Sequence, residues 1–180
     1  VKPERDHNPV AERRKNWWLF TRPIPQLRAA LSQIERYIVV PRTSKRFTFQ
    51  FLDARTVPDT TVVAIASDSA LHLGVLSSLL HVAWANSTGG RMGVGNDPRY
   101  QHKLTFNAFP FPVCSAVSAN RIATLAEQID AHRKRQQAAY PDLTLTGLYN
   151  VLEKLRAGEP LTTKDKAIHD HGLVSVLREL

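Results

Sequence analysis

Two polar stretches contain the residues best suited to bind a polyanion. Arg42-Thr43-Ser44-Lys45-Arg46 is a basic segment, and a glycine-rich segment that begins at Arg91 continues through Arg99 and Lys103. Arginine and asparagine side chains in a flexible loop can read guanine and adenine edges in a DNA groove. Basic loops that contain serine or threonine typically hold phosphates and set register. These residue types therefore favour a nucleic-acid partner.

The net charge of +8 is concentrated in the first third of the chain. Residues 1–55 contain twelve Lys and Arg residues against five Asp and Glu residues, whereas residues 56–180 contain twelve against eleven. Arg13, Arg14 and Lys15 lie in this basic third, beside Trp17-Trp18. A clustered basic surface typically binds a polyanion, most often nucleic acid. The alternative interpretation is a basic tail that only increases solubility.

The sequence lacks the motifs that would make this chain an enzyme by itself. Gly93-Val94-Gly95 is not followed by the third glycine of a dinucleotide loop or by the Gly-Lys-Ser/Thr of a phosphate loop. Gly74-Val75-Leu76-Ser77 does not match a nucleophile elbow. The single cysteine, Cys114, excludes an internal disulfide and a cysteine-rich metal site. Metal-ligand spacing is also missing around His72, His81, His169 and His171. We therefore predict no catalytic, cofactor-binding or metal-binding residues in this chain.

A mixed helical and β framework must position the two polar stretches. Apolar positions at intervals of three and four predict helices, whereas alternating or β-branched apolar residues predict strands. Before residue 112, helices are predicted over residues 26–39 and 70–84, and strands over residues 47–51, 61–66 and 103–106. Gly74 is expected to make the first turn of the second helix irregular.

After Pro112 the pattern becomes helical. Helices are predicted over residues 120–140 and 145–157, and a third begins after Thr162, which forms a capping-box pattern with Asp165. The predicted fold class is α+β, a mixed α/β body with a helical C-terminal segment. Its predicted domains are an extended basic segment over residues 1–16, a body over residues 17–112 and the helical segment over residues 113–180.

The length and composition fit an ordinary globular domain, alone or with a smaller satellite. Trp17-Trp18-Leu19-Phe20 should bury a large apolar area and start the folded part. The sequence has no apolar run of about 18 residues that would span a membrane and no secretory signal, so we expect a cytoplasmic protein. Met92 is the only methionine, and we interpret the chain as a piece of a larger protein.

Four segments together resemble one protein family. They are WWLF, SKRFTFQFLDAR, VVAIASDSALHLGVLSSLLHVAW and GNDPRYQHKLTFNAFPFP, and the helix pattern after Leu143 also fits. The chain resembles the target-recognition region and C-terminal helical tail of MmeI-like, type IIL restriction–modification enzymes and related bacterial adenine-specific DNA methyltransferases. The resemblance covers nearly the whole chain.

The resemblance implies a domain that reads double-stranded DNA beside a catalytic methyltransferase domain of the same parent chain. S-adenosylmethionine would bind in that catalytic domain and not in this chain. By position in the family pattern, base readout is expected at Arg91, Asn96, Asp97 and Arg99. Phosphate contacts are expected at Ser44, Lys45, Arg46 and Lys103. The segment Phe109–Pro112 is expected to pack against the body.

Two other functions remain open on the sequence alone. The first is a non-catalytic protein-interaction module, or a nonspecific polyanion-binding module, whose basic face docks an acidic partner. The second is a small RNA-binding module that stacks single-stranded bases on Trp17 or Trp18. We interpret these tryptophans as core residues instead.

Overall fold

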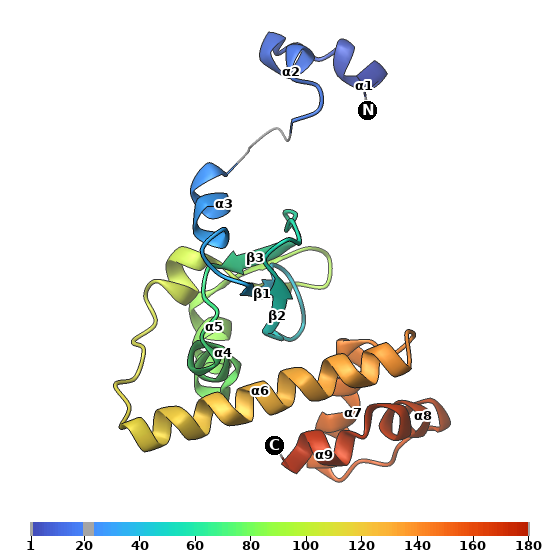
Figure 1. The fold of residues 1–180 in the computed structure, drawn as a ribbon. Coiled ribbons are helices and arrows are strands. Elements are labelled where there is room, and N and C mark those ends of the chain that lie inside the picture. The colour runs from blue at the N-terminus through green and yellow to red at the C-terminus, as the bar shows by residue number, and fades with distance from the viewer. Residues whose placement is uncertain (1, 20–23, 180) are drawn as a thin grey trace.

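The computed structural model describes residues 2–19 and 24–179, which form an N-terminal arm, a mixed α/β body and a group of C-terminal helices (Figure 1). The arm contains two short helices, α1 (Lys2–Asp6) and α2 (Ala11–Lys15). The extended conformation predicted for residues 1–16 is therefore wrong for most of this segment. Local hydrogen bonds turn the chain between the helices, because Asn8 Oδ1 accepts the Val10 amide and the Asn8 carbonyl accepts Arg14 Nη1.

Trp17 and Trp18 belong to this arm and not to the core. Their rings pack edge to face with centroids 5.8 Å apart, and Lys2 Nζ lies 5.7 Å from the centroid of the Trp17 ring. Trp18 is 63% exposed and Leu19 is 46% exposed. The predicted core role of these side chains is wrong because they pack within the arm and not against the sheet. Phe20 lies outside the described residues.

A three-stranded antiparallel sheet forms the centre of the body. Its strand order is β2-β1-β3, with β1 at Arg36–Pro41, β2 at Gln50–Asp53 and β3 at Val62–Ile65. Ile38 of β1 pairs with Phe51 of β2 and with Ile65 of β3. This sheet confirms the strand predicted over residues 61–66.

The central strand β1 corrects the helix predicted over residues 26–39. Helix α3 (Pro25–Leu31) ends early, and the chain then enters β1. Tyr37-Ile38-Val39-Val40 is buried throughout. A short buried apolar run fits helical and strand periods equally well, and its β-branched residues favour the strand.

The predicted strand over residues 47–51 is displaced towards its C-terminal end. Phe47, Phe49 and Phe51 are all buried, which confirms the buried face predicted from their alternation. Regular pairing with β1, however, begins only at Gln50.

The helix predicted over residues 70–84 is two helices, α4 (Ala70–Ser77) and α5 (Leu79–Thr88). Ser78 is extended, and its hydroxyl caps α5 by accepting the His81 amide at 3.2 Å. Gly74 does not disturb α4. A Cβ at Gly74 would lie 2.5 Å from Ile122 Cγ2, so glycine allows the close approach of α4 to α6.

A β-hairpin and a single helical turn follow α5. The hairpin consists of β4 (Gly90–Met92) and β5 (Asp97–Arg99), and η1 (His102–Phe106) is a short π-helix. The strand predicted over residues 103–106 is therefore wrong. Thr105 stabilises the helical turn, because its buried hydroxyl donates to the Gln101 carbonyl at 2.7 Å. Phe109 is buried, as expected of the Phe-Pro-Phe-Pro block, whereas Phe111 is 37% exposed.

Four helices form the C-terminal segment: α6 (Ala116–Ala139), α7 (Leu145–Ala157), α8 (Thr163–Gly172) and α9 (Val174–Glu179). They confirm the helices predicted over residues 120–140 and 145–157. The capping box between Thr162 and Asp165 is also confirmed. Hydrogen bonds from Lys154 and Thr162 lower the pKa of Asp165 to about 2. A second core joins Leu148, Val151, Leu152, Val174 and Leu177.

The long helix α6 connects the body to the C-terminal helices (Figure 1). Asp130 Oδ1 accepts the Phe51 amide at 3.1 Å, and Arg133 Nη1 donates to the Phe49 carbonyl at 2.8 Å. β2 is an edge strand, so these side chains bind backbone groups that a neighbouring strand would otherwise pair. Burial lowers the pKa of Arg133 to about 10, which leaves the guanidinium charged at neutral pH.

The observed mixture of helices and small antiparallel sheets confirms the α+β fold class. Within residues 2–19 and 24–179, none of the helices has the length and apolar character needed to cross a membrane.

Candidate nucleic-acid interface

The residues predicted to read bases lie on an exposed β-hairpin. Arg91 of β4 pairs with Pro98 of β5, and the turn closes where the Asn96 amide donates to the Gly93 carbonyl at 3.0 Å. Gly93 (φ 81°) and Asn96 (φ 50°) both have left-handed backbone conformations, which glycine and asparagine adopt most readily. A two-stranded ribbon of this kind fits the major groove of DNA.

The hairpin divides these residues between its two faces. Side chains alternate along a strand, so Asp97 and Arg99 share one face of β5. Arg91 is paired with Pro98 and therefore lies on the other face, and its Nη1 donates to the Asn96 carbonyl at 3.2 Å. Arg91 and Asn96 are exposed, whereas Asp97 and Arg99 are half-buried. The structure thus brings the four predicted residues together, in two groups.

The basic Arg42–Arg46 loop is hydrogen-bonded to this hairpin. The Ser44 amide donates to the Pro98 carbonyl at 3.1 Å, and the Tyr100 amide donates to the Arg42 carbonyl at 2.8 Å. The two polar stretches of the sequence therefore lie side by side, although strands β2 and β3 and helices α4 and α5 separate them along the chain.

The residues predicted to hold phosphates differ in their surroundings. Lys45 in the loop and Lys103 on η1 are exposed, and within the described parts of the chain neither forms an ion pair or a hydrogen bond through its side chain. Ser44 is half-buried, and its hydroxyl accepts the Arg46 amide at 3.3 Å. Arg46 is also half-buried and contacts α7. The two lysines are thus the most accessible cations of this set.

A buried histidine–tyrosine pair anchors the base of the hairpin. Tyr100 follows β5 directly, and its hydroxyl lies 2.9 Å from Nε2 of His81 on α5. Both side chains are almost completely buried and lie against the Phe49 ring, and His81 also lies against the Phe109 ring. Burial lowers the pKa of His81 to about 4 and raises the pKa of Tyr100. Both side chains are therefore neutral at pH 7, and their hydrogen bond joins α5 to the residue that follows β5.

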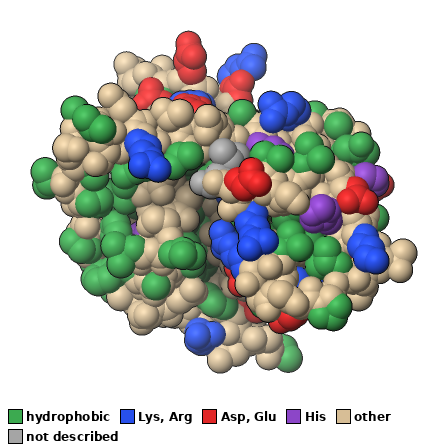
Figure 2. Space-filling view, turned by 90° about the horizontal axis from the view of Figure 1, so that it is seen from below, with side chains coloured by type: hydrophobic (Ala, Val, Ile, Leu, Met, Phe, Trp, Pro, Cys, Tyr) green, Lys and Arg blue, Asp and Glu red, His purple; other side chains and the backbone are tan. Residues whose placement is uncertain are grey.

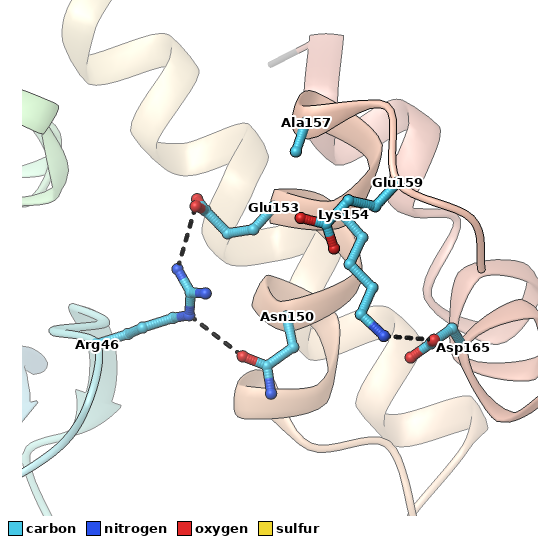
Figure 3. A pocket seen from close by; sticks show the side chains of 7 residues that line it. All are labelled: Arg46, Asn150, Glu153, Lys154, Ala157, Glu159 and Asp165. Atoms are coloured by element: carbon cyan, nitrogen blue, oxygen red, sulfur yellow. Dashed lines mark hydrogen bonds and ion pairs between the residues drawn. The ribbon is translucent and has the colours of Figure 1, made fainter. Parts of the chain in front are cut away.

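Two hollows lie between the body and the C-terminal helices. One, of about 500 Å³, is lined mainly by apolar side chains such as Phe47, Phe49 and Leu152, with Arg133 in its wall. The other, of about 460 Å³, is polar and is drawn in Figure 3. Its lining residues are Arg46, Asn150, Glu153, Lys154, Ala157, Glu159 and Asp165.

Asn150 and Glu153 contact Arg46, and the sequence did not predict these contacts. Both bind Arg46 from α7. The helical period of residues 145–157 predicts which residues of α7 face its own core, but no local signal connects an exposed polar position of this helix to a loop in the body.

On the face that includes the C-terminal helices, the Lys and Arg side chains of the described residues do not gather into a single patch. Figure 2 shows this face from below, with Lys and Arg side chains dispersed among hydrophobic and acidic ones. This distribution agrees with the near balance of charges after residue 55. In the parts of the chain that the structure describes, there is also no cluster of three or more His, Cys, Asp or Glu side chains able to hold a metal ion.

Comparisons with known proteins place this geometry in a family. DNA methyltransferase A of Bacillus subtilis (strain 168) is 31% identical over 117 residues, which are 63% of this chain and 12% of that protein. A solved structure of the type IIL restriction-modification enzyme MmeI in complex with DNA shares the fold with a TM-score of 0.63 and 21% identity. That match covers 96% of this chain and 21% of the MmeI chain, so the chain spans only a small part of either relative.

The family model described as "MmeI, target recognition domain" matches residues 18–113, which include the sheet, the Arg42–Arg46 loop and the β4–β5 hairpin. This match covers more than half of the chain and confirms the resemblance inferred from the sequence motifs. The chain therefore belongs to the family of MmeI target recognition domains.

Proposed function

We propose that this chain recognises a specific sequence in double-stranded DNA as part of a restriction–modification enzyme. The β4–β5 hairpin contacts base edges through Arg91, Asn96, Asp97 and Arg99. Lys45, Lys103, Ser44 and Arg46 contact phosphates and set the register of the duplex.

The observation that carries this proposal is the direct bonding of the basic loop to the hairpin, through Ser44 and Pro98. A reader of DNA needs groups that identify bases and groups that hold the backbone at a fixed offset. Here the residues proposed for the two roles lie mainly on two segments that backbone hydrogen bonds join. Family membership supports the same conclusion, as does the DNA that is bound to the related MmeI structure.

The first experiment tests base readout at Arg99. A duplex selected from a randomised library by the chain without substitutions (the unchanged chain) serves as the preferred site, and a scrambled duplex serves as the competitor. Arg99→Ala should lose roughly 1–3 kcal/mol of binding free energy for the preferred site and little for the competitor. Arg121→Ala is the matched control, because Arg121 is an exposed arginine on α6 whose side chain forms no hydrogen bond or ion pair within the described residues.

The second experiment tests phosphate binding at Lys45. Lys45→Ala should weaken binding to every duplex by a similar factor and reduce the slope of log K against log salt by about 1. If the unchanged chain binds all duplexes equally, the chain is a nonspecific polyanion binder and the recognition proposal is wrong. If the unchanged chain prefers single-stranded nucleic acid, the RNA-binding alternative replaces the recognition proposal.

The activity of the parent protein is a further part of the proposal. The recognised duplex would be presented to an S-adenosylmethionine-dependent catalytic domain of the same chain, which flips and methylates an adenine. The bound methyl donor belongs to that domain and not to the residues described here. An Asn-Pro-Pro-Tyr/Phe motif encoded upstream of Val1 would support this arrangement, and an upstream sequence without it would contradict it.

A further inference from the structure

Arg46, a residue of the proposed phosphate-binding set, is bonded through its side chain to helix α7. Its Nε donates to Asn150 Oδ1 at 3.2 Å, and its Nη1 lies 3.4 Å from Glu153 Oε2. Figure 3 shows the Arg46 side chain reaching from the body to the two α7 residues. Two of its three guanidinium nitrogens are therefore held by one helix.

The third nitrogen of this guanidinium remains available. Nη2 of Arg46 makes no hydrogen bond with any of the described residues, and the Arg46 side chain is 37% exposed. Glu153 is itself placed by a second contact, because Arg156 Nη1 lies 3.7 Å from its other carboxylate oxygen. The planar guanidinium is thus fixed on one side and open on the other.

The same loop is bonded to the hairpin at its other end. The Ser44 amide donates to the Pro98 carbonyl at 3.1 Å, and the Ser44 hydroxyl accepts the Arg46 amide at 3.3 Å. Arg46, which α7 contacts, therefore lies only two residues after Ser44, the residue that is hydrogen-bonded to Pro98 of β5.

We propose that Asn150 and Glu153 are positioning residues for DNA binding, which orient Arg46 so that Nη2 meets a backbone phosphate. This inference rests on the proposed function and extends the DNA-binding unit beyond residues 18–113, into α7. Fixing the side chain before binding lowers the entropy lost when the phosphate contact forms, and Arg is suited to this role because its donors lie in a rigid plane.

The sign of the expected effect distinguishes positioning from simple electrostatics. A carboxylate near the DNA repels phosphates, so removing its charge should strengthen binding if charge were its only effect. If Glu153 positions Arg46, removing its charge by Glu153→Gln should instead weaken DNA binding relative to Glu159→Gln. Glu159 lines the same hollow but, within the described residues, makes no hydrogen bond or ion pair with Arg46, so its variant measures the charge effect.

The experiment is a double-mutant cycle on the 180-residue chain, with the preferred duplex at several salt concentrations. Asn150→Ala should weaken binding by about two- to fivefold, the range expected for one exposed polar contact. Asn120→Ala, which removes an exposed amide from α6, should bind like the unchanged chain. In the Arg46→Gln background, Asn150→Ala should cause no further loss, because the side chain that it positions is gone. Urea denaturation of each variant checks that stability is retained.

Two results would overturn the inference. One is equal DNA affinity in Asn150→Ala and Asn120→Ala. The other is an equal loss of affinity on Asn150→Ala in the unchanged chain and in the Arg46→Gln background. A separate result would overturn the proposed function itself, namely no sequence preference in the unchanged chain. The inference about Arg46 fails alone if preference is present and the cycle shows no coupling.

Discussion

Protonation of His81 should make the fold sensitive to mild acid. His81 is fully buried, and burial lowers its pKa from an ordinary value of 6.5 to about 4. The unfolded chain therefore binds a proton at this position between pH 6.5 and pH 4, while the folded chain does not. A state that binds more protons is favoured as the pH falls, so acidification favours unfolding. The contribution to stability is complete above pH 6.5 and is lost as the pH falls to about 4.

The size of the effect follows from the interval between the two pKa values. Each pKa unit corresponds to about 1.4 kcal/mol. Lowering the pH from 7 to 5 crosses roughly 1.5 units of this interval and should cost about 2 kcal/mol of the free energy of unfolding. Carboxylates such as Asp165, whose pKa is about 2, lose their contribution mainly at lower pH, so the two effects separate.

Urea denaturation followed by tryptophan fluorescence at pH 7 and pH 5 measures this loss. In His81→Gln, which keeps an amide able to bond Tyr100, the loss between the two pH values should be smaller than in the unchanged chain by about 2 kcal/mol. His102→Gln, at an exposed histidine of η1, is the matched control and should retain the full loss. An equal loss in His81→Gln and the unchanged chain would refute the assignment to His81.

Substitutions at three other positions test the backbone and packing arguments. Gly74→Ala should destabilise the chain by about 1–3 kcal/mol, because its Cβ would lie 2.5 Å from Ile122 Cγ2; an unchanged urea midpoint would contradict the close approach of α4 and α6. Gly172→Ala should be destabilising by a similar amount, since its Cβ would lie 2.0 Å from Leu148 Cδ2, and the same assay checks it. Asn96→Gly should preserve stability and Asn96→Val should reduce it, because the left-handed conformation at this position disfavours a β-branched residue; equal thermal midpoints for the two variants would argue against that conformation. Selective loss of the preferred duplex in Asn96→Gly would additionally identify the side chain as a base contact.

Short local signals in the sequence were sufficient for several elements. Thr162 and Asp165 predicted the capping box, and the periodicity of residues 145–157 predicted α7 with its observed bounds. Alternation of Phe47, Phe49 and Phe51 predicted their shared burial. These features depend on residues a few positions apart, so the chain specifies them before any long-range contact forms.

Other elements were decided by tertiary contacts. Tyr37 to Val40 fits both a helix and a strand, and pairing on both sides with β2 and β3 decides for the strand. Trp17 and Trp18 have the composition of core residues but pack within the arm. Residues 103–106 alternate like a strand, yet no neighbouring strand pairs with them within the described chain, and local hydrogen bonds close a π-helical turn.

In the candidate site, too, some features follow from the local sequence and others from tertiary contacts. The sequence by itself identified the residues that we propose to contact DNA, because side-chain chemistry and family motifs are local properties of Arg42–Arg46 and Arg91–Lys103. Only the tertiary structure decided how these residues are combined: Ser44 joins the loop to β5, alternation separates Arg91 from Arg99, and α7 holds Arg46. Such contacts join groups as far apart in the chain as Arg46 and Glu153. Their geometry depends on the packing of the whole body, and so no short segment encodes it.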